Sequence, residues 1–236
     1  MPIELLRLVP RRAMAIYAHP DDADVACAGT LARWHDAASA VELVVCARGD
    51  KGTRDPSART KELVARRAQE IARASEIVGI GRVHQLGRSD GEFDNDLSLR
   101  AEIVALIRVF QPEVLICPDP LAVFFGSHYY NHRDHRVVGF AALDSASPAA
   151  SSPRYFPDAG NPHAVEYALL SGTLEPDTAV DITSTIGRKT DAVACHASQL
   201  EDRDAIGPVI EDRAAEAGAA VGVAFAESFR RVFLAN

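Results

Sequence analysis

One short stretch, "AIYAHPDDAD", places His19, Asp21 and Asp22 directly after an apolar run. A carboxylate at this place would serve as the N-cap of a following helix, and Asp22 or Asp24 fits that structural use. Capping explains one carboxylate and leaves a second carboxylate and a histidine unexplained. Pro20 fixes its own φ angle and favours an extended conformation for the residue before it, so the group is held stiffly. These residues therefore indicate a functional site as well as a cap.

A second group of histidines lies far along the chain, in "HYYNHRDHRVVG" at residues 128–139. His128, His132 and His135 are three of the eight histidines in the chain, and Asp134 lies between the last two. If this segment is helical, His132 and His135 project from one face, because residues three apart are neighbours on a helix. A single surface histidine is usually only solvated. This density of histidines predicts that the second group acts together with the first.

Imidazoles and carboxylates together are typical ligands of a borderline divalent cation such as zinc. Catalytic zinc takes three protein ligands and keeps one position for water, and a further carboxylate can act as general base on that water. Two carboxylates that are adjacent in sequence point in different directions, so one can bind metal while its neighbour faces the water. The spacing favours a metal hydrolase over a purely structural use.

The elements that must position these groups alternate between short apolar runs and longer periodic segments. Buried strands are predicted at residues 13–18, 41–46, 83–86, 114–117, 165–170 and 178–182, and helices at residues 25–38, 60–78, 98–110, 184–198 and 207–229. Residues 144–162, rich in Ala, Ser and Pro, are expected to form a long surface loop. This alternation predicts an α/β fold: a single Rossmann-like domain over residues 1–236, with a mostly parallel sheet and helices on both faces. Ligands of such sheets bind beyond the carboxyl ends of the strands, where both histidine groups would lie.

Composition and charge restrict the classes of function. The 236 residues are 47% hydrophobic and 25% charged, which is typical of a globular protein rather than a disordered one. The net charge of −8 argues against binding to nucleic acid or to an anionic membrane. No apolar run is long enough to span a bilayer, and Arg7, Arg11 and Arg12 interrupt any signal-peptide core. The four cysteines are widely spaced, so buried thiols and a cytoplasmic location are expected.

The motifs resemble those of the PIG-L/LmbE-like family of zinc-dependent N-deacetylases. The family's A-H-P-D-D element matches residues 18–22, its G-T-L element residues 29–31, and its H-x-D-H element residues 132–135. Further matching segments follow in family order and cover nearly the whole chain: "RGDKGTRD", "RRAQEIARASEIVGI", "SDGEF", "KTDAVACHASQ" and "FAESFRRVF". The chain departs from the family pattern at Ala23, where Glu is frequent, and at Asp50, where Glu is common. These departures affect the shape of the pocket rather than the chemistry.

The resemblance implies which residues bind the metal and which one activates the water. It makes His19, Asp22 and His135 the ligands of one zinc ion per subunit, with other divalent metals as alternatives. Asp21 becomes the general base that activates the attacking water. The chemistry implied is metal-assisted hydrolysis of an amide.

The resemblance also implies roles in the second cluster. His132 is expected to protonate the leaving amine or to stabilise the tetrahedral intermediate, with Asp134 as the partner that tunes its basicity. Tyr130 matches a family position that helps to polarise the scissile carbonyl, and Tyr129 is a neighbouring candidate for the same role.

Five further residues are candidates for substrate binding: Arg48, Asp50, Arg54, Asp90 and His196. The first three follow the second predicted strand, where they would contact sugar hydroxyls or an acidic group, or else belong to a solvated loop. Asp90 could equally form a turn. His196 lies in the family's H-x-S-Q element and is expected to line the pocket of its own or a neighbouring subunit, or to be a satisfied interfacial histidine.

The predicted activity is zinc-dependent removal of an N-acetyl or other N-acyl group from an amino sugar or its conjugate. A mycothiol-type conjugate amidase on the same scaffold is the alternative within the family. From other classes, the H-x-D spacing with a distant histidine matches nonhaem iron oxygenases, which usually have an all-β scaffold. A nucleotide-binding module would need a G-x-G-x-x-G or phosphate loop, and neither motif occurs. The resemblance also favours a homo-oligomer, either a trimer or a hexamer.

Overall fold

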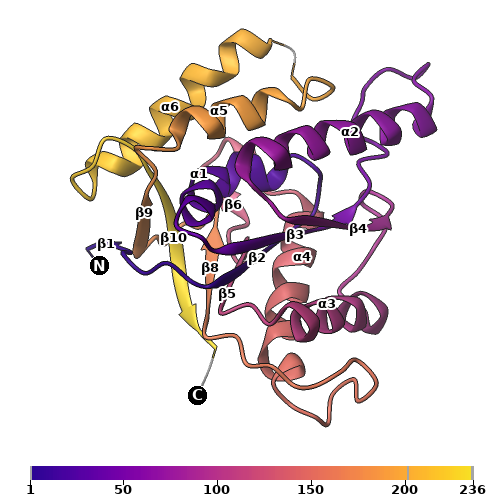
Figure 1. Ribbon diagram of the computed structural model, residues 1–236. Helices are drawn as coiled ribbons and strands as arrows, with labels where there is room; N and C mark the ends of the chain where they lie inside the picture. The colour runs from indigo at the N-terminus through magenta and orange to yellow at the C-terminus, as the bar shows by residue number, and fades with distance from the viewer. Residues whose placement is uncertain (1, 201, 235–236) are drawn as a thin grey trace.

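The apolar runs of the sequence form the strands of one eight-stranded sheet, and the periodic segments form helices around it (Figure 1). The computed structural model describes residues 2–200 and 202–234. The strands are β1 (Glu4–Leu5), β2 (Arg12–Tyr17), β3 (Ala40–Ala47), β4 (Arg82–Arg88), β5 (Val114–Pro118), β6 (Phe124–Phe125), β7 (Tyr129–Tyr130), β8 (Tyr167–Ser171), β9 (Thr178–Asp181) and β10 (Ala226–Phe233). The helices are α1 (Asp22–Asp36), α2 (Thr60–Val78), α3 (Leu97–Phe110), α4 (Arg133–Asp144), α5 (Ile186–Ala194) and α6 (Arg203–Ala219), with a π-helical turn at Ser145–Ala150 after α4.

The order of strands across the sheet is β1-β9-β10-β8-β5-β2-β3-β4, while β6 and β7 form a separate hairpin. β2 pairs in parallel with both β3 and β5, and β5 pairs in parallel with β8. Within the described part of this sheet, β10 alone runs antiparallel to its neighbours, β8 and β9. The predicted α/β class with a mostly parallel sheet is confirmed.

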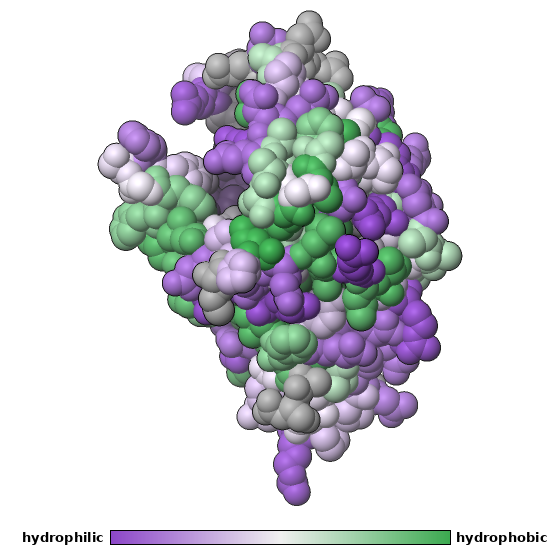
Figure 2. Space-filling view, turned by 90° about the vertical axis from the view of Figure 1, so that its left-hand side faces the viewer, coloured by the Kyte–Doolittle hydropathy of each residue, from purple (hydrophilic) through white to green (hydrophobic). Residues whose placement is uncertain are grey.

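The central strands are apolar throughout because both of their faces are covered. In β2, Ala15 and Tyr17 pack in one core with residues of α1, α2 and α5, whereas Met14 and Ile16 pack in a second core with residues of α3 and α4. Figure 1 shows the same layers, with α1, α2, α5 and α6 on one face of the sheet and α3 and α4 on the other. On the face drawn in Figure 2, apolar residues gather in patches among hydrophilic ones.

The predicted helix over residues 207–229 is wrong in its second half. Helix α6 ends at Ala219, and residues 226–233 form strand β10 instead. Gly222 adopts a left-handed conformation between them (φ +76°), which L side chains rarely adopt, and the helix cannot continue through it. Tertiary pairing decides the rest, because β10 fills the gap between β8 and β9 and satisfies the backbone groups of both strands.

The predicted surface loop over residues 144–162 is also wrong in its first part. The turn at residues 145–150 is interrupted at Ser147, whose backbone is extended (φ −141°, ψ 126°), and Ser145, Ala146 and Ala150 are buried. Arg108 of α3 organises the rest: its buried guanidinium donates hydrogen bonds to backbone carbonyls of residues 149, 150, 152, 155, 156 and 160. A composition rich in Ala, Ser and Pro carries no sign of this distant partner.

Two other expectations concern membrane spans and cysteines. No helix in the described ranges combines the length and the apolarity needed to cross a bilayer. Cys27, Cys46 and Cys117 are buried as expected, and Cys195 is half-buried. Burial raises the pKa of the Cys117 thiol to about 12, so it stays protonated near neutral pH.

Candidate metal and active site

The two histidine groups meet at the edge of the sheet where the strand order changes direction. The chain passes from β2 to β3 on one side of β2 and later returns to β5 on the other side. The loop after β2 carries the first group, and the segment between β5 and α4 carries the second. In parallel sheets, ligands bind at such a switch point, beyond the carboxyl ends of the strands.

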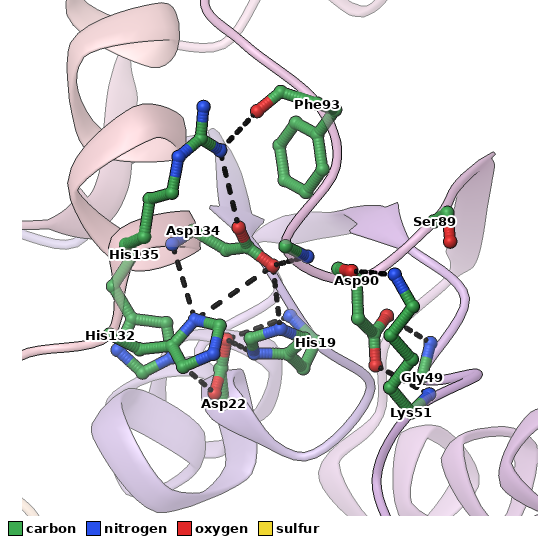
Figure 3. Close-up of polar contacts among 12 residues, drawn as sticks. His19, Asp22, Gly49, Lys51, Ser89, Asp90, Phe93, His132, Asp134 and His135 are labelled. Atoms are coloured by element: carbon green, nitrogen blue, oxygen red, sulfur yellow. Dashed lines mark hydrogen bonds and ion pairs between the residues drawn. The ribbon is translucent and has the colours of Figure 1, made fainter.

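Asp22 lies between His19 and His135 in the assembled site (Figure 3). One carboxylate oxygen, Oδ1, is 3.2 Å from Nε2 of His135, and the other, Oδ2, is 3.4 Å from Nδ1 of His19. Oδ2 also accepts a hydrogen bond from the backbone N–H of His19 at 2.7 Å. The expected capping role is not seen: α1 begins at Asp22 itself, and neither Asp22 nor Asp24 occupies the N-cap position.

Three histidines converge around this carboxylate. His19, His132 and His135 each offer a ring nitrogen, and these three atoms lie within 4.8 Å of one another. His132 is the residue just before α4 rather than part of it, and its Nδ1 accepts a hydrogen bond from the backbone N–H of Asp134. His128, the third histidine of the sequence cluster, is exposed on the loop before β7 and lies outside this group.

In His135 and His19, the ring nitrogen that does not face Asp22 has a hydrogen-bond partner of its own. Nδ1 of His135 is 3.1 Å from the side-chain oxygen of Asn131, so Nε2 of His135 is left to face Asp22. Asp134 Oδ2 lies 3.2 Å from Nε2 of His19 and 3.8 Å from Nδ1 of His132. Such outer partners fix the tautomer and orientation of a metal-ligating histidine. Asp134 thus contacts His19 more closely than His132, the partner that the family resemblance implies.

The histidines and carboxylates of this site shift one another's pKa values strongly. Burial disfavours the charged form of His19, but the carboxylates of Asp22 and Asp134 outweigh it and raise the pKa of His19 to about 10. Burial likewise opposes the charge on Asp22, yet His135 and His19 hold the pKa of its carboxyl well below the usual range. The pKa of His132 is lowered by burial and by the charge of His19. The site is thus a buried ion-pair network in which a cation could replace protons.

The donor set fits a metal ion. Imidazole nitrogens and a carboxylate suit a borderline divalent cation, and their ligand atoms are close enough to meet at one centre. Ligands must lose their protons to bind a metal, so binding would displace the proton that the carboxylates hold on His19. The described residues therefore provide a site that could hold a metal ion, with two overlapping ligand sets: the three histidines, or His19 and His135 with Asp22.

Asp21 is held by an arginine that sequence reasoning did not single out. Oδ1 of Asp21 accepts a hydrogen bond of 2.5 Å from Nη2 of Arg67, whose side chain is only 3% exposed. Arg67 packs against Gly49, where a Cβ would lie 2.5 Å from the guanidinium and where φ is +73°. The signal in the sequence is the pair Arg66–Arg67 on a predicted helix, but only the helix phase shows which of the two points inward.

The wall of the site beyond Asp21 is built from the loops after β3 and β4. Asp50 accepts hydrogen bonds from Arg48 (2.9 Å), from Ser89 Oγ (2.8 Å) and from the backbone of Asp90 (2.9 Å). Asp90 in turn accepts the backbone N–H groups of residues 49 and 51. Burial opposes the charge on Asp50, but these donors hold the pKa of its carboxyl well below the usual range. The structure brings Asp90 to the site, with Arg48 and Asp50 behind it, whereas Arg54 is exposed and does not line the site.

The two tyrosine candidates occupy different environments. Tyr129 lines a cavity of about 770 Å³ together with Asp22 and His135. Tyr130 is exposed, and its hydroxyl accepts a hydrogen bond from Arg136 at 2.6 Å. Of the two tyrosines, Tyr129 therefore shares a cavity with Asp22 and His135, and Tyr130 is bonded to Arg136.

His196 does not line the cavity that Tyr129 lines. It is 1% exposed and lies 2.7 Å from the carboxylate of Asp24, which is also buried. Its neighbours in the H-x-S-Q element make similar ties: Ser198 bonds to Glu70 of α2, and the Gln199 side chain donates to the carbonyl of residue 52. The element therefore fixes α1, α2 and the loop after β3 relative to one another.

The fold and the site together define an α/β enzyme with a centre that could hold a metal at the carboxyl ends of its strands. A family model described as "PIG-L: GlcNAc-PI de-N-acetylase" matches residues 14–146, more than half of the chain. The chain belongs to this PIG-L family of deacetylases.

Named relatives agree with this assignment. A diacetylchitobiose deacetylase of Thermococcus kodakarensis is 31% identical over 81% of this chain and 71% of its own length. A 1D-myo-inositol 2-acetamido-2-deoxy-alpha-D-glucopyranoside deacetylase of Streptomyces avermitilis is 30% identical over 66% of this chain and 59% of its own length. Among solved structures, the N,N'-diacetylchitobiose deacetylase of Pyrococcus horikoshii superposes with a TM-score of 0.85 at 27% identity, over 94% of this chain and 84% of that one. The match argues against the iron oxygenase and nucleotide-binding alternatives.

Proposed function

We propose that this protein is a zinc-dependent hydrolase that removes an N-acyl group from an amino sugar or an amino-sugar conjugate. The observation that carries the proposal is the position of Asp22 between His19 and His135, with a further carboxylate, Asp21, next to it in sequence. The relatives named as deacetylases of chitobiose and of an acetamido sugar linked to inositol support the substrate class. A mycothiol-type conjugate amidase remains the alternative, because it would need the same residues.

Zinc would be held by His19, Asp22 and His135, and when bound it would lower the pKa of a water molecule and polarise the amide carbonyl. The protein prepares this ligand set in advance. Asn131 directs His135 through its other ring nitrogen, and Asp134 does the same for His19. These partners restrict the rings to one orientation, which reduces the cost of assembling the centre.

Asp21 is the proposed general base. Arg67 engages Oδ1 of Asp21 through a short hydrogen bond, so we assign the uptake of the water proton to Oδ2. The buried guanidinium also limits the rotation of the carboxylate. A base that is held in place in this way accepts a proton without first having to reorient.

His132 is the proposed donor to the reacting group. Its Nδ1 accepts the backbone N–H of Asp134, so the neutral ring carries its proton on Nε2. That N–H can stabilise the oxyanion of the tetrahedral intermediate, and the protonated ring can supply the leaving amine nitrogen. Tyr129, rather than Tyr130, is the proposed second group at the scissile carbonyl, because it shares a cavity with Asp22 and His135.

The test is release of free amine from a panel of N-acetylated amino sugars and conjugates, with metal analysis of the same preparation. We expect hydrolysis by protein that holds one zinc per chain. His132→Ala separates the two ligand sets: it should keep the metal if Asp22 is a ligand, and lose it if the three histidines are. Release of amine that does not change when the metal is removed would overturn the proposal. The cytoplasmic location and the trimer or hexamer stay predictions from the sequence.

A further inference from the structure

The metal site borders two hollows of different character. The smaller one, of about 340 Å³, is polar and is lined by His19, Asp21, Arg67 and His132 among others. The larger one, of about 770 Å³, shares Asp22 with the smaller one and also includes His135. The larger cavity therefore opens onto the metal site rather than forming a separate pocket elsewhere on the molecule.

Apolar side chains from three parts of the chain form much of the larger cavity. They are Val25 of α1, Phe125 and Tyr129 of the β6–β7 hairpin, and Ile210, Ala214 and Ala217 of α6. The rings of Phe125 and Tyr129 lie 5.8 Å apart, so they present one continuous aromatic surface. Aromatic and aliphatic walls of this kind bind apolar ligands by excluding water.

The buried charged and hydroxyl-bearing side chains in this wall are already engaged with the protein. Lys189 donates hydrogen bonds to Glu227 at 2.5 Å and to the carbonyl of Val25 at 2.7 Å. The side chains of Lys189 and Glu227 are each about 5% exposed. The hydroxyl of Tyr17 is hydrogen-bonded to Ser171 at 2.8 Å. A sugar would bury hydroxyls that need new partners here, whereas an alkyl chain needs none. The exposed Arg213 and the half-buried Ser228 also line this cavity. Away from these two side chains, the cavity is suited to an alkyl chain rather than to a sugar ring.

We propose that this cavity receives the acyl group of the substrate, and that the preferred substrates are amino sugars whose N-acyl chain is longer than acetyl. The proposal rests on the function proposed above. An acetyl methyl is about the size of one water molecule, roughly 30 Å³, so acetyl would leave most of the 770 Å³ unused. A saturated chain of several methylenes would occupy more of this space and bury more apolar surface, and each buried methylene strengthens binding about fourfold.

The reaction is the same for a long acyl group as for acetyl. The oxygen of water bonds to the acyl carbon, the C–N bond breaks, and a proton from the water passes to the amine nitrogen. The products are a fatty acid and a free amino sugar, and no reactant other than water is needed. The sugar stays in the polar hollow beside Arg67 and Asp90, so the scissile amide lies next to Asp22, where the two hollows meet.

The experiment compares kcat/KM of the zinc-loaded protein for N-acetyl-, N-butanoyl- and N-octanoylglucosamine, measured by release of free amine. We expect at least about a tenfold preference for octanoyl over acetyl, because more than one methylene becomes buried. Efficient hydrolysis of the acetyl compound with no gain for longer chains would overturn this inference and leave the proposed function intact. Hydrolysis of none of the three, by protein that does hold zinc, would overturn both.

A pair of variants tests the cavity itself. Ala217→Phe places a large ring inside the cavity and should bring the octanoyl-to-acetyl ratio of kcat/KM down towards one or below. Ala219→Phe, on the exposed side of the same helix, should keep the wild-type ratio. A further measurement does not depend on a variant: octanoate should inhibit wild-type hydrolysis of the acetyl compound at a concentration at least about tenfold lower than acetate does. Equal inhibition by the two acids, or an unchanged ratio in Ala217→Phe, would overturn the inference.

Discussion

Two groups of charged side chains lie against the first turns of α1, and they differ in whether their charges are already matched. We call the first the open cluster: His19, Asp21, Asp22, His132 and His135. We call the second the closed cluster: Asp24, His196, Lys189 and Glu227. The closed cluster is made of two buried pairs, each member 5% exposed or less. The open cluster borders both hollows.

The difference shows that charge density alone does not mark a functional site. In the closed cluster Lys189 is paired with Glu227 and Asp24 with the ring of His196, and Glu227 also accepts the backbone N–H groups of Gly29 and Thr30 in α1. Gly29 itself must lack a side chain, because a Cβ would lie 2.8 Å from Ile182. The G-T-L element therefore serves packing. In the open cluster, several ring nitrogens compete for one carboxylate, and a cation can take the place of their protons.

The largest effect is expected from removing a proposed metal ligand of the open cluster. His19→Ala should weaken zinc binding by at least about 100-fold, which is more than the loss of an outer partner costs, and hydrolysis should fall with it. Zinc content after dialysis, measured by atomic absorption, checks this. His128→Ala is the matched control, because His128 belongs to the same sequence cluster as His132 but is exposed outside the site. Full zinc occupancy in His19→Ala would remove His19 from the centre.

Asp21→Asn should distinguish the proposed general base from the proposed metal ligands of the open cluster. The amide keeps the shape of the carboxylate but cannot take a proton, so kcat should fall about 10² to 10⁴-fold with zinc content unchanged. Steady-state kinetics and metal analysis on one preparation are sufficient. If zinc is lost together with the rate, Asp21 is a ligand and the division of roles between the two aspartates is wrong.

Glu227→Ala tests the closed cluster. It leaves Lys189 charged and buried without its partner, so the free energy of unfolding should fall by about 3–5 kcal/mol. Glu211→Ala, at an exposed position on α6, should change it by less than about 0.5 kcal/mol. Denaturant unfolding of both variants gives the comparison. A loss of stability no larger in Glu227→Ala than in Glu211→Ala would mean that the buried pair has no structural role.

The smallest effect is expected at Asp50, whose charge supports the wall of the open cluster. Because the pKa of Asp50 is lowered in the folded protein, its charge stabilises the fold at pH values above about 4, the pKa of an aspartate in the unfolded chain. This contribution is lost as the pH falls through that range and below it. Asp50→Asn should therefore be less stable than wild type by about 1 kcal/mol at pH 7, and the difference should shrink towards pH 2. Asp212→Asn, an exposed position, should show no such convergence in pH-dependent unfolding.

Much of the fold could be predicted from local sequence because the central strands, such as residues 13–18, are apolar on both faces. Strand β10 could not, because "FAESFRRVF" tolerates a helix and only its place between β8 and β9 makes it a strand. Gly218 and Gly222 were the available signals of a break before it. The buried turn after α4 was missed for a related reason: the residue that orders it, Arg108, lies in another helix.

The sequence by itself determined the types of chemical group in the site and the strand ends from which they come, because residue types and periodicity are local properties. Only the tertiary structure decided which atoms meet. It placed Asp134 closer to His19 than to His132, turned Arg67 onto Asp21, and buried His196 against Asp24. These pairings join residues on different elements, and their geometry depends on how the helices pack against the sheet. No spacing along the chain carries that information.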